Sequence, residues 1–536
     1  MMNRTWLLRA LAVTVAVVLG ACGGGGGGGG GGFPLIGLPV PGATTVTLNG
    51  TVTFDSVPNT TGTLNYSAIT AKPVRGAVVE VVNGASVVLA TATTDANGTY
   101  SVSVPSNTSI VVRVKAQMLQ GGSGASWDVT VRDNTQSNAI YAMETPAFSS
   151  GADAALTRNV HAPSGWNGTS YASTRVAGPF ALLDTVYTTQ AKVLSVAPAA
   201  VFPSLRVFWS VNNVPASGTL ALGQIGTTFF TNSSTGRAIY VLGKENVDTD
   251  EYDAPVVAHE WGHYYQSAFS RDDSPGGSHS LSELLDRRLA FSEGWGNAWS
   301  GIALGRNNYT DSAGPGQTQG SNLILSAGAT SNPGWYREAS IHSILWNLNS
   351  QVGFKPIHDT LTGPFKTGVP VTSIHPFTAA FNVAAPGSVA ALNTLLVGQG
   401  INAASNDPFG AQETNGGGGS VASFALPMYR SATMGGTTSA CVTNQAGADN
   451  KLGSFVYLRF TVPTAGNYTI TAAATGPGAA AADPDFAVFA GRQIAQADGL
   501  GASETAVVGL PAGDNVLVLS DFNNSSANTC FNVTIQ

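Results

Sequence analysis

The chain has 536 residues, of which 10% are charged and 65 are glycine, and its formal net charge is −7. This length is too great for one ordinary core, so about three domains are expected. The acidic balance without a basic patch argues against nucleic acid as a partner, and the charge-poor, glycine-rich composition is typical of strand-rich exported proteins.

The N-terminal segment has the pattern of an export signal. Arg4 and Arg9 precede an apolar run over residues 11–19 that is too short for a lasting membrane span. The run ends in Leu19-Gly-Ala-Cys22, which resembles the bacterial lipobox, in which the cysteine becomes the lipidated first residue of the mature protein. The resemblance implies membrane attachment through Cys22 and an outer-membrane or cell-surface address. A secretory signal with an incidental cysteine is the alternative.

Residues 1–22 are therefore the expected signal peptide, and the glycine-rich residues 23–43 are the expected flexible tether. With Cys22 lipidated, Cys441 and Cys530 remain. An even pair of cysteines in an oxidising compartment predicts one disulfide.

Residues 44–145 show period-two alternation of apolar and polar side chains with frequent turns, which predicts strands. Asn97-Gly98 supplies a hairpin turn. The stretch 74–115 resembles the carboxypeptidase-regulatory-like, transthyretin-type β-sandwich found beside secreted enzymes. The resemblance implies an all-β domain that serves as a spacer or a binding module.

Residues 146–432 change character and carry the chemistry. Helical spacing over 179–194 is followed by expected strands at 205–211 and 238–243. The strand 238–243 is expected at the sheet edge, where a peptide could bind by strand addition.

The motif His259-Glu-Trp-Gly-His263 is the H-E-x-x-H signature. Pro255 predicts a helix start, which places the two histidines one turn apart on one face, so that both imidazoles reach one Zn²⁺ ion. Glu260 is then positioned to take a proton from water. A chance match is the alternative. The apolar flanks, however, predict a buried helix, and three polar side chains are costly to bury there unless they have a partner such as a metal ion.

The third zinc ligand is expected from a glutamate, because Phe269 occupies the position where a metzincin would carry histidine. Glu283 belongs to a Ser-x-x-Glu capping box that predicts a helix start. Glu293 instead lies in the apolar helical run 289–304, where an unpaired carboxylate is costly to bury, so Glu293 is preferred. This run resembles the Asn-Glu-Gly or Asn-Glu-Ala helix of gluzincin peptidases, with Ser292 in place of the usual Asn.

The gluzincin resemblance implies that Glu260 is the general base and that a downstream Tyr or His stabilises the oxyanion. A third helix is expected to start near Trp335, and its Tyr336, Arg337 and His342 are the candidates. A buried core histidine is the alternative interpretation of His342. His279, from the loop 271–280 expected as an insertion between the two ligand helices, could act instead.

Four carboxylates precede the H-E-x-x-H helix: Asp248, Asp250, Glu251 and Asp253. They could bind Ca²⁺, which takes oxygen ligands, but the spacing lacks the glycine and the distal glutamate of a calcium loop. Compensation of the helix dipole by a solvated loop is the preferred interpretation.

Residues 433–536 return to strand patterns and look like a pre-peptidase C-terminal domain, a β-sandwich found beside secreted peptidases. The sequence thus predicts a multidomain protein, with an α+β zincin-like metallopeptidase core flanked by two all-β sandwich domains. We expect a monomeric, membrane-anchored zinc peptidase that acts on a protein or peptide. The alternatives are a glycoprotein-directed metallopeptidase with glycan-binding sandwiches, and a non-catalytic binding or adhesion lipoprotein with a structural metal.

Overall fold

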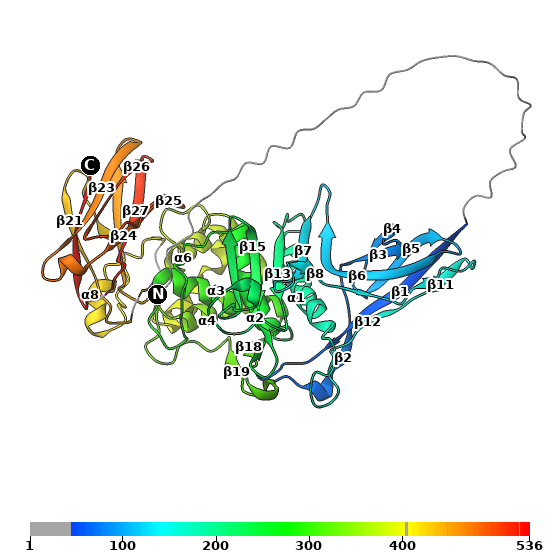
Figure 1. The fold of residues 1–536 in the computed structure, drawn as a ribbon. Coiled ribbons are helices and arrows are strands. Elements are labelled where there is room, and N and C mark those ends of the chain that lie inside the picture. The colour runs from blue at the N-terminus through cyan, green and yellow to red at the C-terminus, as the bar shows by residue number, and fades with distance from the viewer. Residues whose placement is uncertain (1–43, 403–405, 448, 525) are drawn as a thin grey trace, which may run out of the picture. The chain divides into compact units, whose positions relative to one another are not determined.

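The computed structural model describes residues 44–402, 406–447, 449–524 and 526–536 (Figure 1). The expected signal peptide, the glycine tether and Cys22 lie outside these residues. Within the described chain, helices and sheets are mixed, and the sheets are of the layered, sandwich-like kind.

The strands before the first helix are divided between two sheets, and strands that follow each other in the chain often belong to different sheets. They are β1 (Thr45–Ser56), β2 (Thr70–Pro73), β3 (Ala77–Asn83), β4 (Val88–Thr93), β5 (Thr99–Pro105), β6 (Ser109–Gln120), β7 (Trp127–Asp133), β8 (Ala139–Ile140), β9 (Ala142–Glu144), β10 (Phe148–Ser149), β11 (Ala155–Thr157) and β12 (Val160–Ala162). β1 pairs with β5 along its first half and with β2 along its second. Val46, Leu48, Val52 and Phe54, on one face of β1, are buried, as period-two alternation requires.

The larger sheet has the order β14-β15-β13-β7-β6-β3-β4. Its later members are β13 (Leu205–Trp209), β14 (Phe229–Ser233) and β15 (Gly236–Val241). β13 pairs in parallel with β7, placing Leu205 opposite Val129, so the sheet runs across the expected boundary at residue 145. Val131 and Val207 belong to one hydrophobic core that extends from the N-terminal strands into the helices.

The helices occupy the middle of the chain. They are α1 (Ala177–Leu194), α2 (Ala254–Phe269), α3 (Arg287–Leu304), α4 (Glu338–Val352), α5 (Phe354–Thr362), α6 (Ile374–Ala384), α7 (Val389–Gly398) and α8 (Ala422–Ala425). α2 packs against α3, and α3 packs against α4 (Figure 1). The expected helices at 179–194, around the H-E-x-x-H motif and over 289–304 are confirmed.

Three local expectations are wrong. No helix starts at the Ser-x-x-Glu box of 280–283; α3 begins at Arg287, where the Asp286 side chain accepts a hydrogen bond from the Arg288 N–H at 3.1 Å. α4 begins at Glu338 rather than near Trp335. β15 is not the sheet edge, because the preceding strand β14 pairs antiparallel along it and takes the outer position.

Among the described residues, no single helix has the length and apolar character needed to cross a membrane. The pair Ile374–Ala384 and Pro386–Gly398, bent by 115°, passes that test by length and composition only.

The C-terminal strands form two further sheets around a core of their own. The first has the order β20-β22-β27-β24-β25 and the second β21-β28-β23-β26. Their bounds are β20 (Arg430–Ser431), β21 (Thr437–Val442), β22 (Phe455–Val462), β23 (Gly466–Thr475), β24 (Pro484–Phe489), β25 (Gln493–Ala497), β26 (Ser503–Leu510), β27 (Gly513–Asp521) and β28 (Thr529–Ile535). The expected disulfide is confirmed: Cys441 on β21 is bonded to Cys530 on β28.

Candidate metal centre

Helix α2 presents both motif histidines to helix α3. Pro255 lies in the first turn of α2, where its missing N–H costs no hydrogen bond. Trp261 of α2 stacks on Trp299 of α3 with ring centroids 5.4 Å apart, which anchors the helix pair. The two helices approach closely at Gly296, where a Cβ would lie 2.7 Å from the ring of His259. A glycine at this position therefore makes room for the imidazole.

The approach of α2 and α3 brings His259, His263 and Glu293 together. His259 Nε2 lies 3.1 Å from His263 Nε2 and 3.1 Å from Glu293 Oε2. His263 Nε2 lies 3.5 Å from the same carboxylate oxygen. His259 and Glu293 are 6% and 8% exposed. The three residues form a group whose ligand atoms could hold one metal ion.

The donor atoms have the spacing that zinc needs. Bonds of about 2.0–2.2 Å in a tetrahedral site place neighbouring donor atoms about 3.3–3.6 Å apart. The three separations, 3.1, 3.1 and 3.5 Å, lie near this range. Two imidazole nitrogens and one carboxylate oxygen are also ligand types that zinc binds in catalytic sites. The residues present therefore fit a zinc ion.

Both imidazoles are oriented through their other ring nitrogen. His259 Nδ1 lies 2.9 Å from Asn297 Oδ1, and His263 Nδ1 lies 3.2 Å from Ser292 Oγ. Asn297 in turn donates to Glu338 Oε1 at 2.5 Å. Such contacts select the tautomer whose Nε2 lone pair is free for a metal. Ser292, which replaces the Asn of the gluzincin pattern, thus contacts the second histidine.

Glu260 lies beside the histidines and is held by the edge strand. Its Oε2 accepts a hydrogen bond from the Phe230 N–H of β14 at 2.7 Å. Because this N–H donates to Glu260, it points away from the partner strand β15. Burial raises the pKa of Glu260, while the neighbouring His259 and His263 oppose that shift.

His279 reaches the same carboxylate from the loop between α2 and α3. Its Nε2 lies 3.3 Å from Glu293 Oε2, and its Nδ1 lies 3.0 Å from Glu338 Oε2. The side chain is 28% exposed, so it forms part of the open side of the group. Glu338 therefore joins His279 to Asn297 and closes a ring of polar contacts that returns to His259.

The charges of His263, His279 and Glu293 shift the pKa values of these three groups strongly. Burial alone would raise the pKa of Glu293, but His263 and the hydrogen bonds from the histidines hold it well below its usual range. Burial opposes a charged His263, yet the Glu293 carboxylate raises its pKa to about 10. Burial also opposes a charged His279, yet its bonds to Glu293 and Glu338 raise its pKa to about 11. A carboxylate that attracts positive charge this strongly is suited to bind a cation.

The other sequence candidates have different polar partners. The Tyr336 hydroxyl donates to Asn415 Oδ1 at 2.7 Å, and His342 Nε2 lies 3.1 Å from the Ala327 carbonyl. Both side chains are buried, and within the described residues neither forms a hydrogen bond or ion pair with the His259, His263 and Glu293 group. Arg337 donates to the carbonyls of Ser282 and Leu281 and so fixes the His279 loop. The catalytic role of Tyr336 and His342 stays a prediction.

Glu283, the alternative ligand, is directed elsewhere. Its carboxylate pairs with Lys451 at 3.4 Å and is 38% exposed. Tyr309, on β18 (Asn308–Asp311), is a neighbour of the site that sequence reasoning missed. Its ring lies edge-on to His259 with centroids 5.9 Å apart. β18 pairs antiparallel with β19 (Ser321–Ile324) and lies against α2, and no local sequence pattern predicts that contact with α2.

The four carboxylates that precede α2 divide into two groups. Glu251 pairs with Arg175 at 2.9 Å, and Asp253 accepts from the Ser312 N–H at 2.8 Å. Asp248 and Asp250 instead lie near Asp311 of β18. The set considered from sequence for Ca²⁺ is thus not gathered around one point.

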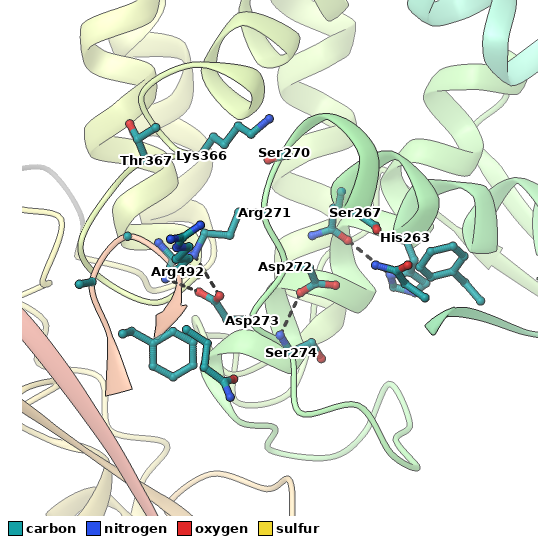
Figure 2. A pocket seen from close by; sticks show the side chains of 17 residues that line it. His263, Ser267, Ser270, Arg271, Asp272, Asp273, Ser274, Lys366, Thr367 and Arg492 are labelled. Atoms are coloured by element: carbon teal, nitrogen blue, oxygen red, sulfur yellow. Dashed lines mark hydrogen bonds and ion pairs between the residues drawn. The ribbon is translucent and has the colours of Figure 1, made fainter. Parts of the chain in front are cut away.

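A cleft of 860 Å³ opens beside His263. Phe230 and Asn232 of β14 line one part of it, and residues 489–493 from the turn between β24 and β25 line another. Figure 2 shows His263 and Arg492 on opposite sides of this cleft, with the ion pair of Arg271 and Asp273 between them. Lys366 and Arg492 are exposed and give the far side basic character.

Comparison with known proteins gives a weak, partial structural likeness. No family model matches the chain, and no curated protein matches it. The pre-peptidase C-terminal domain of a collagenase from Bacillus anthracis aligns over 20% of this chain and 94% of its own, at 11% identity and a TM-score of 0.17. A periplasmic inhibitor of g-type lysozyme from Aeromonas hydrophila aligns over 20% of this chain and 96% of its own, at 13% identity and a TM-score of 0.14. Likenesses at these TM-scores carry no argument about function.

Proposed function

We propose that this chain is an exported zinc-dependent peptidase with a zincin-like core, in which His259, His263 and Glu293 hold the metal. The observation that carries the proposal is the spacing of their three donor atoms, 3.1 to 3.5 Å, close to that of a tetrahedral zinc site. When bound, zinc acts as a Lewis acid that acidifies water and polarises a substrate carbonyl.

Glu260 is the general base in this proposal. It takes a proton from the attacking water and passes it to the leaving amine. The Phe230 N–H holds its carboxylate in one orientation, at 2.7 Å, without neutralising its charge. Burial, which raises the pKa of Glu260, strengthens it as a base.

The substrate lies along β14 in this proposal. β14 is the edge of its sheet, so a peptide in extended conformation could pair with its outer backbone groups other than the Phe230 N–H, which donates to Glu260. The cleft beside His263 continues from this edge toward Lys366 and Arg492. Two exposed basic side chains there favour acidic side chains in the substrate.

His279 is proposed to donate a hydrogen bond to the oxyanion that develops on the substrate. It borders the ligand group, is partly exposed, and is oriented by Glu338 at 3.0 Å. An oriented N–H near the reacting carbonyl is what this step needs. We retain Tyr336 and His342 as predicted contributors that lack this contact.

Export and anchoring through Cys22 are part of the same proposal. The N-terminal sequence pattern supports them, as does the Cys441–Cys530 disulfide, because disulfides persist in oxidising compartments. Replacing Cys22 with Ser should move the protein from the membrane fraction to the soluble fraction, measured by immunoblotting after cell fractionation. Retention of the variant in the membrane fraction would contradict lipid attachment at Cys22.

The central test separates metal binding from chemistry. Glu260→Gln keeps the shape of the side chain and should retain about one zinc per chain while peptide cleavage falls by about 10²–10⁴-fold. Zinc is measured by atomic emission and cleavage on a mixed peptide library. Glu283→Gln is the matched control, because Glu283 is a nearby glutamate that pairs with Lys451 and should leave both readouts unchanged. Undiminished cleavage by Glu260→Gln, or purified wild type without zinc, would refute the proposal.

A further inference from the structure

A second cluster of ionisable side chains lies before the N-terminal end of α2 and shares no residue with the histidine group. Asp248 and Asp250 come from β17 (Asp248–Thr249) and the residue that follows it, and Asp311 ends β18. One carboxylate oxygen of each lies within 4.8 Å of those of the other two. About sixty residues separate the two contributing segments in the chain.

Within the described residues, each of these three carboxylates has a buried oxygen, Oδ1, to which no N–H or hydroxyl group donates. The only hydrogen bond between the three described carboxylates themselves joins Asp248 and Asp250 when one of them is protonated. Asp250 is only 2% exposed, and its other oxygen is already bound by the Thr228 hydroxyl. Buried acceptors without partners are rare in proteins because leaving them unsatisfied is costly. Three carboxylates that lie this close together, each with one such oxygen, indicate a ligand that is shared among them.

The charge of the cluster is not balanced by a basic side chain in the part of the chain that the structure describes, where no Lys, Arg or His forms an ion pair with Asp248, Asp250 or Asp311. Lys244 lies opposite Asp248 in the pairing of β16 (Gly243–Lys244) with β17, but it is exposed and forms no such pair. The nearest other acids, Glu251 and Asp253, are bound by Arg175 and Ser312.

Burial and mutual repulsion raise the affinity of the cluster for positive charge. They raise the pKa of Asp248 to about 7, and burial raises the pKa of Asp311 to about 6. The pKa of Asp250 is raised well above its usual value by burial and by the neighbouring carboxylates of Asp248, Asp311 and Asp253. A proton or a cation can relieve this repulsion, but a single proton satisfies fewer of the oxygens than a cation does.

We propose that Asp248, Asp250 and Asp311 bind a Ca²⁺ ion that joins the loop before α2 to strand β18. The donor set consists of oxygen alone, which suits a hard cation and lacks the nitrogen or sulfur donors typical of structural zinc. Carboxylates from separate segments also provide the adaptable geometry that Ca²⁺ accepts more readily than Mg²⁺ does.

Calcium at this point acts on the neighbouring helix. Asp253, three residues after Asp250, precedes the first residue of α2 and accepts hydrogen bonds from Ser312, the residue after Asp311. The two segments that hold the cluster are thus linked a second time beside it. The bound ion fixes the start of α2, which carries His259, relative to β18, which carries Tyr309. This role does not depend on peptidase activity.

The experiment measures calcium binding at constant zinc. Full-length protein is dialysed against EGTA, reloaded with zinc, and titrated with calcium chloride at pH 8 by isothermal titration calorimetry, with Tm measured in parallel. Wild type should bind about one Ca²⁺ and gain several °C in Tm at saturating calcium. Asp311→Asn should weaken binding at least about tenfold, since it removes one of three charges.

The stability of Asp311→Asn in the absence of calcium is a second readout, which can be measured even if the variant binds no calcium. Without calcium, Asp311→Asn should be at least as stable as wild type, because Asn removes a repelling charge. Asp359→Asn is the matched control: Asp359 is an exposed aspartate paired with Lys355 on α5, and this change should leave calcium binding intact. Unaltered binding by Asp311→Asn, an equal Tm gain with magnesium chloride alone, or no binding by wild type at millimolar calcium would each overturn the proposal. Zinc content stays constant throughout, so failure here is distinct from failure of the peptidase proposal.

Discussion

The histidine group on α2 and α3 and the aspartate cluster before α2 shift the pKa values of their carboxylates in opposite directions. In the first, histidines surround one carboxylate, and the pKa of Glu293 falls well below its usual range. In the second, carboxylates surround each other, and the pKa of Asp248 rises to about 7. Burial alone does not set the charge of a site: Glu293 and Asp250 are both almost fully buried, yet their pKa values shift in opposite directions because their neighbours differ. The two sites also differ in their donor atoms, which are nitrogen and oxygen in the first and oxygen only in the second.

The strongest challenge to this comparison is removal of the central carboxylate. Glu293→Ala leaves two imidazoles and should lose most of the bound zinc, with peptide cleavage falling by more than about 10³-fold. Zinc content after dialysis and cleavage rates measure the effect. The calcium affinity of the same variant should stay unchanged, because Glu293 belongs to the other cluster; a parallel loss of calcium would show that the two sites are not independent.

The His279 contact is tested by truncating that side chain. His279→Ala should lower kcat by about 10²–10³-fold while zinc content stays the same, because an oxyanion donor acts on the reaction rather than on the metal. His161→Ala, which removes a histidine on β12 paired with Asp55, is the control. If His279→Ala lost zinc and kept its kcat per bound zinc, His279 would be assigned to the metal group instead.

The orienting contacts of the histidine group should have a smaller effect. Asn297→Ala removes the partner of His259 Nδ1, at 2.9 Å, and should weaken zinc affinity by about 10–100-fold. Competition with a chromogenic chelator measures this change. An affinity equal to that of wild type would show that Asn297 does not orient the imidazole.

The smallest expected effect is on stability and tests the aspartate cluster without calcium. Groups whose folded-state pKa is raised contribute stability below their unfolded value, and this stability is lost as pH rises through the folded value. For Asp311, which the variant Asp311→Asn removes, that window runs from about 4 to about 6. Wild type in EGTA should therefore lose on the order of 2 kcal/mol relative to Asp311→Asn across this window. Urea denaturation at several pH values measures the difference, and saturating calcium should abolish it at pH 8; a difference that grew toward low pH would contradict the sign.

The elements of the site could be predicted from sequence where the signals are local. Apolar spacing and Pro255 predicted α2, and the cost of burying Glu293 in an apolar helix selected it over Glu283, which pairs with Lys451. The helix expected from the capping box at 280–283 was wrong because Asp286 caps α3 instead. A short polar motif can satisfy its own backbone without starting a helix.

What depends on distant pairing could not be predicted. Asp311 joins Asp248 and Asp250 only because the chain returns beside the start of α2 after α3. Likewise, β14 displaced the expected edge strand because a hairpin folds it onto β15. Strand periodicity identifies which faces are buried, but it does not say which strand lies at the edge of a sheet.

The pairing of β7 with β13 has a practical consequence for anyone who shortens this protein. An expression fragment that starts at residue 146 would leave β13 without its neighbour and expose a row of unpaired backbone groups. It would also uncover Val207, which is buried in the core shared with the N-terminal strands. We expect such a fragment to aggregate, because its open sheet edge can pair with the edge of another chain. A fragment that keeps this shared core intact therefore has to begin before β1, at about residue 44.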